Sequence, residues 1–170
     1  FKKYCFDEKL IPDGYKWMRA IVSGTTFKDN MDLNLFYDRE SRKFSEHGYI
    51  GLYKDKSIRA IGKIKKTVLA IEMNGAMTYQ TESGETVTSE EIKRIEEAIR
   101  RADDYGYNLR TISHRYFIVE KFYPTDFRKS SKNPIQKSKF FNLADMFGYK
   151  VIPNTEQIAT DLNGRTWEEF

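Results

Sequence analysis

Apolar and polar positions in the first half of the chain form short runs that are typical of β-strands. Each run is rich in β-branched or aromatic residues and is bounded by Gly, Pro, Asp or Asn, which is the usual signature of strands separated by turns. The pattern predicts five strands in this half, at Tyr4–Phe6, Lys16–Val22, Leu33–Tyr37, Tyr49–Tyr53 and Ile58–Ile64, the last continuing through a bend near Lys66.

The clearest helix follows these strands, because the apolar residues now recur every three or four positions. Thr88 is a natural N-cap, Glu91 stands where a capping box needs an acid, and Gly106 suits the end of the helix. The apolar stripe of this helix is formed by Ile92, Ile95, Ile99 and Ala102.

The second half predicts one long strand and two short helices. The strand covers His114–Tyr123 and ends at Pro124, and the polar segment Arg128–Lys139 is expected to be a loop. The two short helices start at the caps Asn142 and Asn154 and stop at Gly148 and Gly164. This order of elements predicts an α+β fold around a mixed or antiparallel sheet, in one domain over residues 1–170 with a helical extension from about residue 140.

Length and cysteine content restrict the class of protein. A chain of 170 residues is long enough for one domain with its own core. The single cysteine, Cys5, excludes an internal disulfide framework and favours a reducing, cytoplasmic location. No apolar run is long enough to span a bilayer, so no membrane partner is expected. Because the chain starts at Phe1, we expect it to be a fragment of a longer protein, and other domains of that protein are possible partners.

The sequence offers little evidence for catalysis. It contains no phosphate-binding GxxxxGKS/T loop, no dinucleotide fingerprint and no nucleophile elbow. Its two histidines, His47 and His114, have no second ligand at metal-site spacing. We therefore predict no catalytic residue, no metal and no cofactor.

Basic residues are concentrated in two segments. Residues 48–66 carry six basic side chains and one acidic side chain, while residues 107–139 carry eight basic and two acidic side chains. The net charge of the second segment, +6, exceeds the +4 of the whole chain, so the remainder must be net acidic. A concentrated positive patch suits a phosphate backbone, whose counterions are released on binding.

Aromatic residues are interleaved with these charges, which is the usual equipment for holding unpaired or extruded bases. The alternative is that the rings belong to the core and that the lysines only keep edge strands soluble. Gly51 and Gly62, inside strand-like runs, indicate sharp coiling of the strands, a bulge, or close approach of another backbone or a ligand. The turn near Asp55 has no decisive signature, so the register of this hairpin is not predicted.

Three segments together resemble the PUA-like superfamily, especially its EVE and YTH branches. They are YIGLYKDKSIRAIGKI, YKWMRAIVSG and HRYFIVEKFYPTDF, and the resemblance extends over about Tyr4 to Phe127. It implies a small, strongly twisted mixed or antiparallel β-barrel flanked by one long and two short helices. It also implies binding of nucleic acid, with a modified, methylated base extruded into an aromatic pocket, as in the recognition module of a modification-dependent restriction system.

The resemblance selects Trp17 as the wall on which a base stacks, with Tyr15, Tyr49 and Tyr53 as further base-binding candidates. A core position is the alternative for Trp17, and packing of the tail is expected for Trp167. DNA is favoured over RNA. The predicted contacts to the nucleic-acid backbone are Lys54, Lys56, Arg59, Lys63, Lys65, Arg115, Arg128, Lys129 and Lys132.

Two other functions stay open. The first is an ASCH-type ribonuclease or nucleoside-modifying enzyme, in which Lys63, Lys121, Tyr123 or Asp126 would act as acid, base or phosphate clamp. The second is a protein-interaction domain or a sensor of a nucleotide ligand, in which the basic segments meet an acidic partner.

Overall fold

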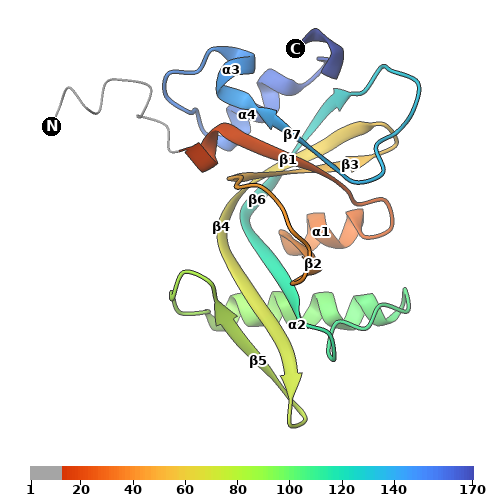
Figure 1. Ribbon diagram of the computed structural model, residues 1–170, viewed down its shortest axis with the longest axis vertical. Coiled ribbons are helices and arrows are strands. Elements are labelled where there is room, and N and C mark those ends of the chain that lie inside the picture. Colours follow the sequence, from red (N-terminus) through yellow and green to blue (C-terminus); the bar gives the residue numbers. More distant parts are fainter. Residues whose placement is uncertain (1–12) are drawn as a thin grey trace, which may run out of the picture. The chain divides into compact units, whose positions relative to one another are not determined.

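The computed structural model describes residues 13–170, which form an α+β fold built on a seven-stranded twisted sheet (Figure 1). The strand order is β2-β6-β4-β3-β1-β7, β5 pairs with β4, and within these residues the sheet is open at β2 and β7. The predicted α+β class with a mixed sheet is confirmed. The elements are η3 (Asp13–Lys16), β1 (Trp17–Val22), α1 (Phe27–Leu33), β2 (Leu35–Arg39), β3 (Tyr49–Lys54), β4 (Ser57–Met73), β5 (Ala76–Thr81), α2 (Ser89–Asp103), β6 (His114–Arg128), β7 (Ser138–Asn142), α3 (Leu143–Phe147), α4 (Thr155–Leu162) and η4 (Trp167–Glu169).

The described residues divide into two compact units, and the long strands β4 and β6 each contribute to both. The first unit comprises residues 13–27, 45–63 and 121–170, and the second comprises residues 28–44 and 64–120. The prediction of a single domain over the whole chain stays a prediction.

The first unit is organised around β1, which runs parallel to β3 and antiparallel to β7. Successive strand residues point to opposite faces of a sheet. Met18 and Ala20 therefore share one face, where they belong to a buried core with Ile158 and Leu162 of α4. Trp17 alternates with Met18 and faces the other side of the sheet.

The second unit holds the long helix α2 against its own strands. Ile95 and Ile99 of α2 share a buried core with Val68 of β4 and Tyr116 of β6. The predicted capping box is confirmed, since the Thr88 side chain accepts from the backbone N–H of Glu91 and the Glu91 side chain accepts from that of Thr88.

The hairpin β3–β4 has a register that the sequence left open. Tyr49 faces Lys63 and Lys54 faces Ser57, with an irregularity between Leu52 and Tyr53. A Cβ added to Gly51 would lie 3.0 Å from the Met18 sulfur and 3.1 Å from Ile58 Cγ2, so side chains crowd this glycine, and the expected approach of a backbone or ligand stays a prediction.

Several predicted boundaries were wrong. The strand expected at Leu33–Tyr37 starts at Leu35, because Phe27–Leu33 form α1 and Asn34 turns the chain with a φ of 50°. The strand expected to end at Pro124 continues to Arg128 as β6, and the expected loop Arg128–Lys139 ends in β7. The predicted strand Tyr4–Phe6, with Cys5, lies outside the described residues.

Candidate functional site

The parts of the two basic segments that belong to the first unit, residues 48–63 and 121–139, meet at the tip of the β3–β4 hairpin. The backbone N–H of Lys129 donates to the Lys56 carbonyl oxygen over 2.8 Å, and Lys56 Nζ donates to the Lys132 carbonyl oxygen over 3.1 Å. These hydrogen bonds hold residues that are more than seventy positions apart in the sequence next to one another. We call the resulting group of cations the hairpin-tip cluster: Lys54, Lys56, Arg59, Arg128, Lys129 and Lys132.

The turn that carries this cluster has an unfavourable backbone. Asp55 and Lys56 have φ values of 51° and 58°, in the left-handed region that favours glycine. Arg59 holds the turn, because its Nε donates to the Lys54 carbonyl oxygen (3.0 Å) and its Nη2 to that of Asp55 (3.1 Å). The sequence predicted Arg59 as a phosphate contact, but two of its N–H groups are already used in hydrogen bonds to this turn.

Asp126 is the carboxylate that the cluster surrounds. It accepts from Ser57 Oγ over 2.6 Å, lies 3.0 Å from Arg128 Nε and lies 3.5 Å from Arg59 Nη1. The Ser57 hydroxyl and the two arginines hold the pKa of the Asp126 carboxyl below its usual value. The other acids of the tip are Asp55 and Glu168, which accepts from the backbone N–H of Ser130 over 2.7 Å, so six cations face three carboxylates and the tip keeps a net positive charge.

Trp17 lines a pocket of about 330 Å³ together with Ser45, Glu46 and Phe140. In the part of the chain that the structure describes, neither the indole N–H of Trp17 nor the Ser45 hydroxyl nor the Glu46 carboxylate has a hydrogen-bond partner. The pocket therefore combines two aromatic rings with an unused donor and unused acceptors. Ligand pockets are usually of this kind, mostly apolar with a few polar groups.

The other predicted aromatic residues differ from Trp17. Tyr49 and Tyr53 are only 1 % and 3 % exposed and belong to the core, so as base-binding residues they are corrected: their rings have no free face. The Tyr15 ring is half-buried and has Lys63 Nζ 4.9 Å from its centroid. Trp167 packs as expected, because it is buried and its indole N–H donates to the Phe127 carbonyl oxygen over 2.9 Å.

Trp17 and the hairpin tip lie at opposite ends of the same strands. Trp17 opens β1, whereas Val22, at its other end, pairs with Tyr53 beside the tip. The usual rise per residue puts these two ends about 17 Å apart. Tyr49 and Tyr53 of β3 face the same core as Met18 of β1. Lys54 alternates with Tyr53, and Trp17 alternates with Met18. The side chains of Lys54 and Trp17 therefore both lie on the opposite face of the sheet.

Two of the residues predicted to contact the nucleic-acid backbone, Lys65 and Arg115, belong to the second unit, where acidic side chains lie close to them. Arg115 Nε lies 2.6 Å from Glu82, and Lys65 Nζ lies 3.9 Å from the buried Glu91. The structure therefore does not place Lys65 and Arg115 in the hairpin-tip cluster.

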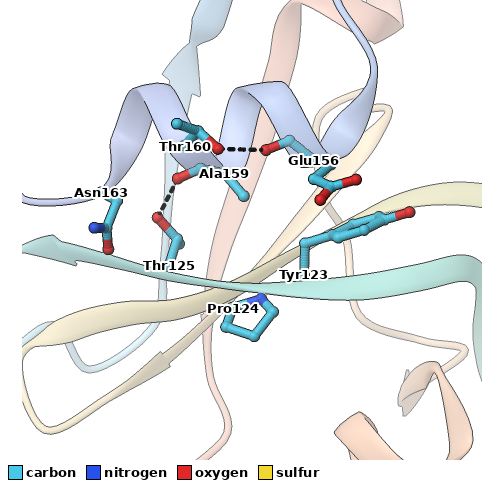
Figure 2. A pocket seen from close by; sticks show the side chains of 7 residues that line it. All are labelled: Tyr123, Pro124, Thr125, Glu156, Ala159, Thr160 and Asn163. Carbon is cyan, nitrogen blue, oxygen red and sulfur yellow. Dashed lines mark hydrogen bonds between the residues drawn. The ribbon is translucent and has the colours of Figure 1, made fainter.

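A second pocket, of about 410 Å³, lies between β6 and α4 (Figure 2). Tyr123 and Thr125 point towards α4 and Pro124 points away from it, and Thr125 Oγ1 donates to the Ala159 carbonyl oxygen over 2.7 Å. Asp126, which alternates with Thr125, points to the other face. The candidate catalytic residues Tyr123 and Asp126 are thus separated by the strand, and Lys121 Nζ lies over the Tyr123 ring.

Among residues 13–170 no group of three or more His, Cys, Asp or Glu side chains is placed to hold a metal ion. Within the same range, every helix is too short or too polar to cross a membrane.

No protein-family model matches the chain, and no curated protein matches it. Two solved structures are similar to it. One is an ASCH protein from Zymomonas mobilis, with 10 % sequence identity and a TM-score of 0.47, covering 88 % of this chain and 97 % of that chain. The other is a serine-to-alanine mutant of ASCH from Zymomonas mobilis, with 10 % identity and a TM-score of 0.42, covering 75 % of this chain and 89 % of that chain.

Proposed function

We propose that the first unit binds nucleic acid, with the hairpin-tip cluster on the phosphates and one unpaired or extruded base in the Trp17 pocket. The observation that carries this proposal is the junction of the two basic segments through Lys56, Lys129 and Lys132. This junction places cations from distant parts of the sequence at one end of the paired strands β1 and β3, and Trp17 lies at the other end of β1.

Phosphate contacts and base stacking contribute to binding in different ways. Each phosphate that a lysine neutralises releases counterions, which gives affinity without reading the sequence. Stacking a base on an aromatic ring contributes about 1–3 kcal/mol, which offsets the few kcal/mol needed to unstack it. A methyl group on the base would add apolar contact with Trp17 and Phe140. The narrower form of the proposal is therefore a methylated base in DNA.

Binding of fluorescent single-stranded and duplex oligonucleotides, with and without methylated bases, tests the proposal at several salt concentrations. We expect Lys129→Ala to weaken binding to all sequences alike and to reduce the salt dependence. We expect Trp17→Ala to remove the preference among bases while the salt dependence stays. Lys150→Ala, an exposed lysine of the same unit outside the cluster, is the matched control. Failure of every DNA and RNA to bind at low salt would overturn the proposal.

A further inference from the structure

The Trp17 pocket contains a carboxylate that the fold itself does not use. Glu46 forms no hydrogen bond and no ion pair within the described part of the chain. The Glu46 side chain is exposed and passes close to Gly14, since a Cβ added to Gly14 would lie 2.9 Å from Glu46 Oε1 and 3.3 Å from its Cγ. The absence of a side chain at Gly14 thus leaves room for this carboxylate beside the pocket.

The neighbouring hydroxyl is equally available. Ser45 lines the same pocket, and its described hydrogen bond uses only the backbone, since the Ser45 carbonyl oxygen lies 2.8 Å from His47 Nδ1. The side-chain hydroxyl can both donate and accept, whereas an ionised carboxylate only accepts. The pocket therefore offers two carboxylate acceptors next to a hydroxyl that can donate.

We propose that Glu46 makes this pocket selective for guanine, an inference that rests on the proposed function. On its Watson–Crick edge guanine carries two neighbouring N–H donors, on N1 and on the exocyclic amino group, followed by the O6 acceptor. The two Glu46 oxygens accept from the two N–H groups, and the Ser45 hydroxyl donates to O6. Trp17 and Phe140 contact the faces or edges of the ring.

The other bases match this arrangement less well. Adenine and cytosine place a ring nitrogen acceptor beside their amino group, and this acceptor would face a carboxylate oxygen. Uracil and thymine place their one ring N–H between two carbonyl oxygens. A good bidentate contact discriminates by about 1–3 kcal/mol, so we expect guanine to bind about 10- to 100-fold more tightly.

The test uses short single-stranded oligothymidines that carry one central guanine, hypoxanthine, adenine or cytosine. Hypoxanthine lacks the exocyclic amino group of guanine and removes one donor only. We expect the affinity to fall from guanine to hypoxanthine to the other bases. Glu46→Gln should lose the guanine preference and gain affinity for adenine, because its amide presents one donor and one acceptor. Glu156→Gln, which makes the same charge change in the other pocket, should keep the preference for guanine.

A second variant tests the position of the carboxylate without changing the charge. Gly14→Ala places a methyl group against Glu46, so we expect a weaker guanine preference with unchanged salt dependence. Equal affinity for all four oligonucleotides, combined with weaker but still salt-dependent binding in Trp17→Ala, would overturn the guanine selectivity and leave the proposed function standing. Absence of binding to all of them, at low salt, would overturn both.

Discussion

At the scale of a single residue, the left-handed backbone of Lys56 lowers the stability of the fold at the candidate site. A left-handed backbone costs an L-residue about 1–2 kcal/mol relative to glycine, and such strain persists only where the surroundings enforce it. Arg59 and the backbone N–H of Lys129 supply that enforcement. Lys56 therefore occupies a position at which glycine would be less strained.

We expect Lys56→Gly to be more stable than Lys56→Ala by about 1 kcal/mol, because only glycine relieves the positive φ. Both variants lose the same ammonium group and its bond to the Lys132 carbonyl oxygen, so the comparison isolates the backbone. Denaturant unfolding of the two variants measures the difference. Equal stability would show that the turn is not strained at this residue.

His47 makes the stability of the protein depend on pH. Burial lowers the pKa of this imidazole to about 4, the Arg19 charge lowers it too, and the bond to the Ser45 carbonyl oxygen opposes both. The unfolded chain therefore binds a proton below about pH 6.5 that the folded chain does not bind until about pH 4. Stability contributed by the neutral ring is lost as the pH falls through this window.

We expect acidification from pH 6.5 to 4 to lower the free energy of unfolding by up to about 3 kcal/mol more in the wild type than in His47→Gln. Urea unfolding at a series of pH values measures this. Burial also lowers the pKa of His114, so His114→Gln serves as the comparison for a histidine in the second unit. Parallel pH profiles for wild type and His47→Gln would contradict the assignment.

At the scale of elements, one buried ion pair joins β4 to the start of α2. Lys66 Nζ lies 2.8 Å from Glu91 Oε1 and also donates to the Thr86 carbonyl oxygen. Burial by itself would raise the pKa of the Glu91 carboxyl, but Lys66 and the backbone N–H of Thr88 outweigh it and hold the pKa below its usual value. The stability from this carboxylate is therefore present near neutral pH and is lost on acidification.

We expect Lys66→Met to lower the free energy of unfolding by about 3 kcal/mol, because it leaves the buried Glu91 carboxylate with only the more distant, exposed Lys65 ammonium group. The double variant with Glu91→Gln should recover part of that loss. A double-mutant cycle from denaturant unfolding measures the coupling. If the changes in unfolding free energy of the two single variants simply add in the double variant, the interaction between Lys66 and Glu91 does not stabilise the fold.

The elements with a complete local signature were the ones that sequence could predict. For α2, the apolar stripe, the capping box and Gly106 all agree. The strand β5 was missed because its alternating side chains are mostly exposed or half-buried and supply no clear apolar face. The two-residue turn at Asp55 and Lys56 was missed because it lacks the glycine or asparagine that usually marks a left-handed turn.

The candidate site was predictable only in part, for a similar reason. Charge along the chain identified the segments of the hairpin-tip cluster, but their junction depends on hydrogen bonds between residues such as Lys56 and Lys132. A tyrosine in a strand gives no sign of which face it occupies, so Tyr49 and Tyr53 looked like Trp17. Ser45 and Glu46 were missed because neither belongs to a motif. Only their place beside Trp17 and Phe140 distinguishes them.

At the scale of the whole molecule, charge is divided between the two units. Within residues 13–170 the first unit carries fourteen basic and nine acidic residues, a net charge of +5, while the second carries twelve basic and fourteen acidic residues, a net charge of −2. In the second unit arginines such as Arg101 and Arg115 are matched by nearby carboxylates. The positive field is therefore a property of the first unit, where the hairpin-tip cluster lies.

This division predicts how binding responds to salt. The logarithm of affinity falls with the logarithm of salt concentration by about 0.7 for each phosphate neutralised on a single strand. A triple variant with alanine at Lys54, Lys129 and Lys132 should therefore lose about 2 from that slope. The matched control places alanine at the exposed lysines Lys43, Lys93 and Lys150, which changes the total charge equally. Equal slopes for the two triple variants would mean that net charge, and not the hairpin-tip cluster, attracts the nucleic acid.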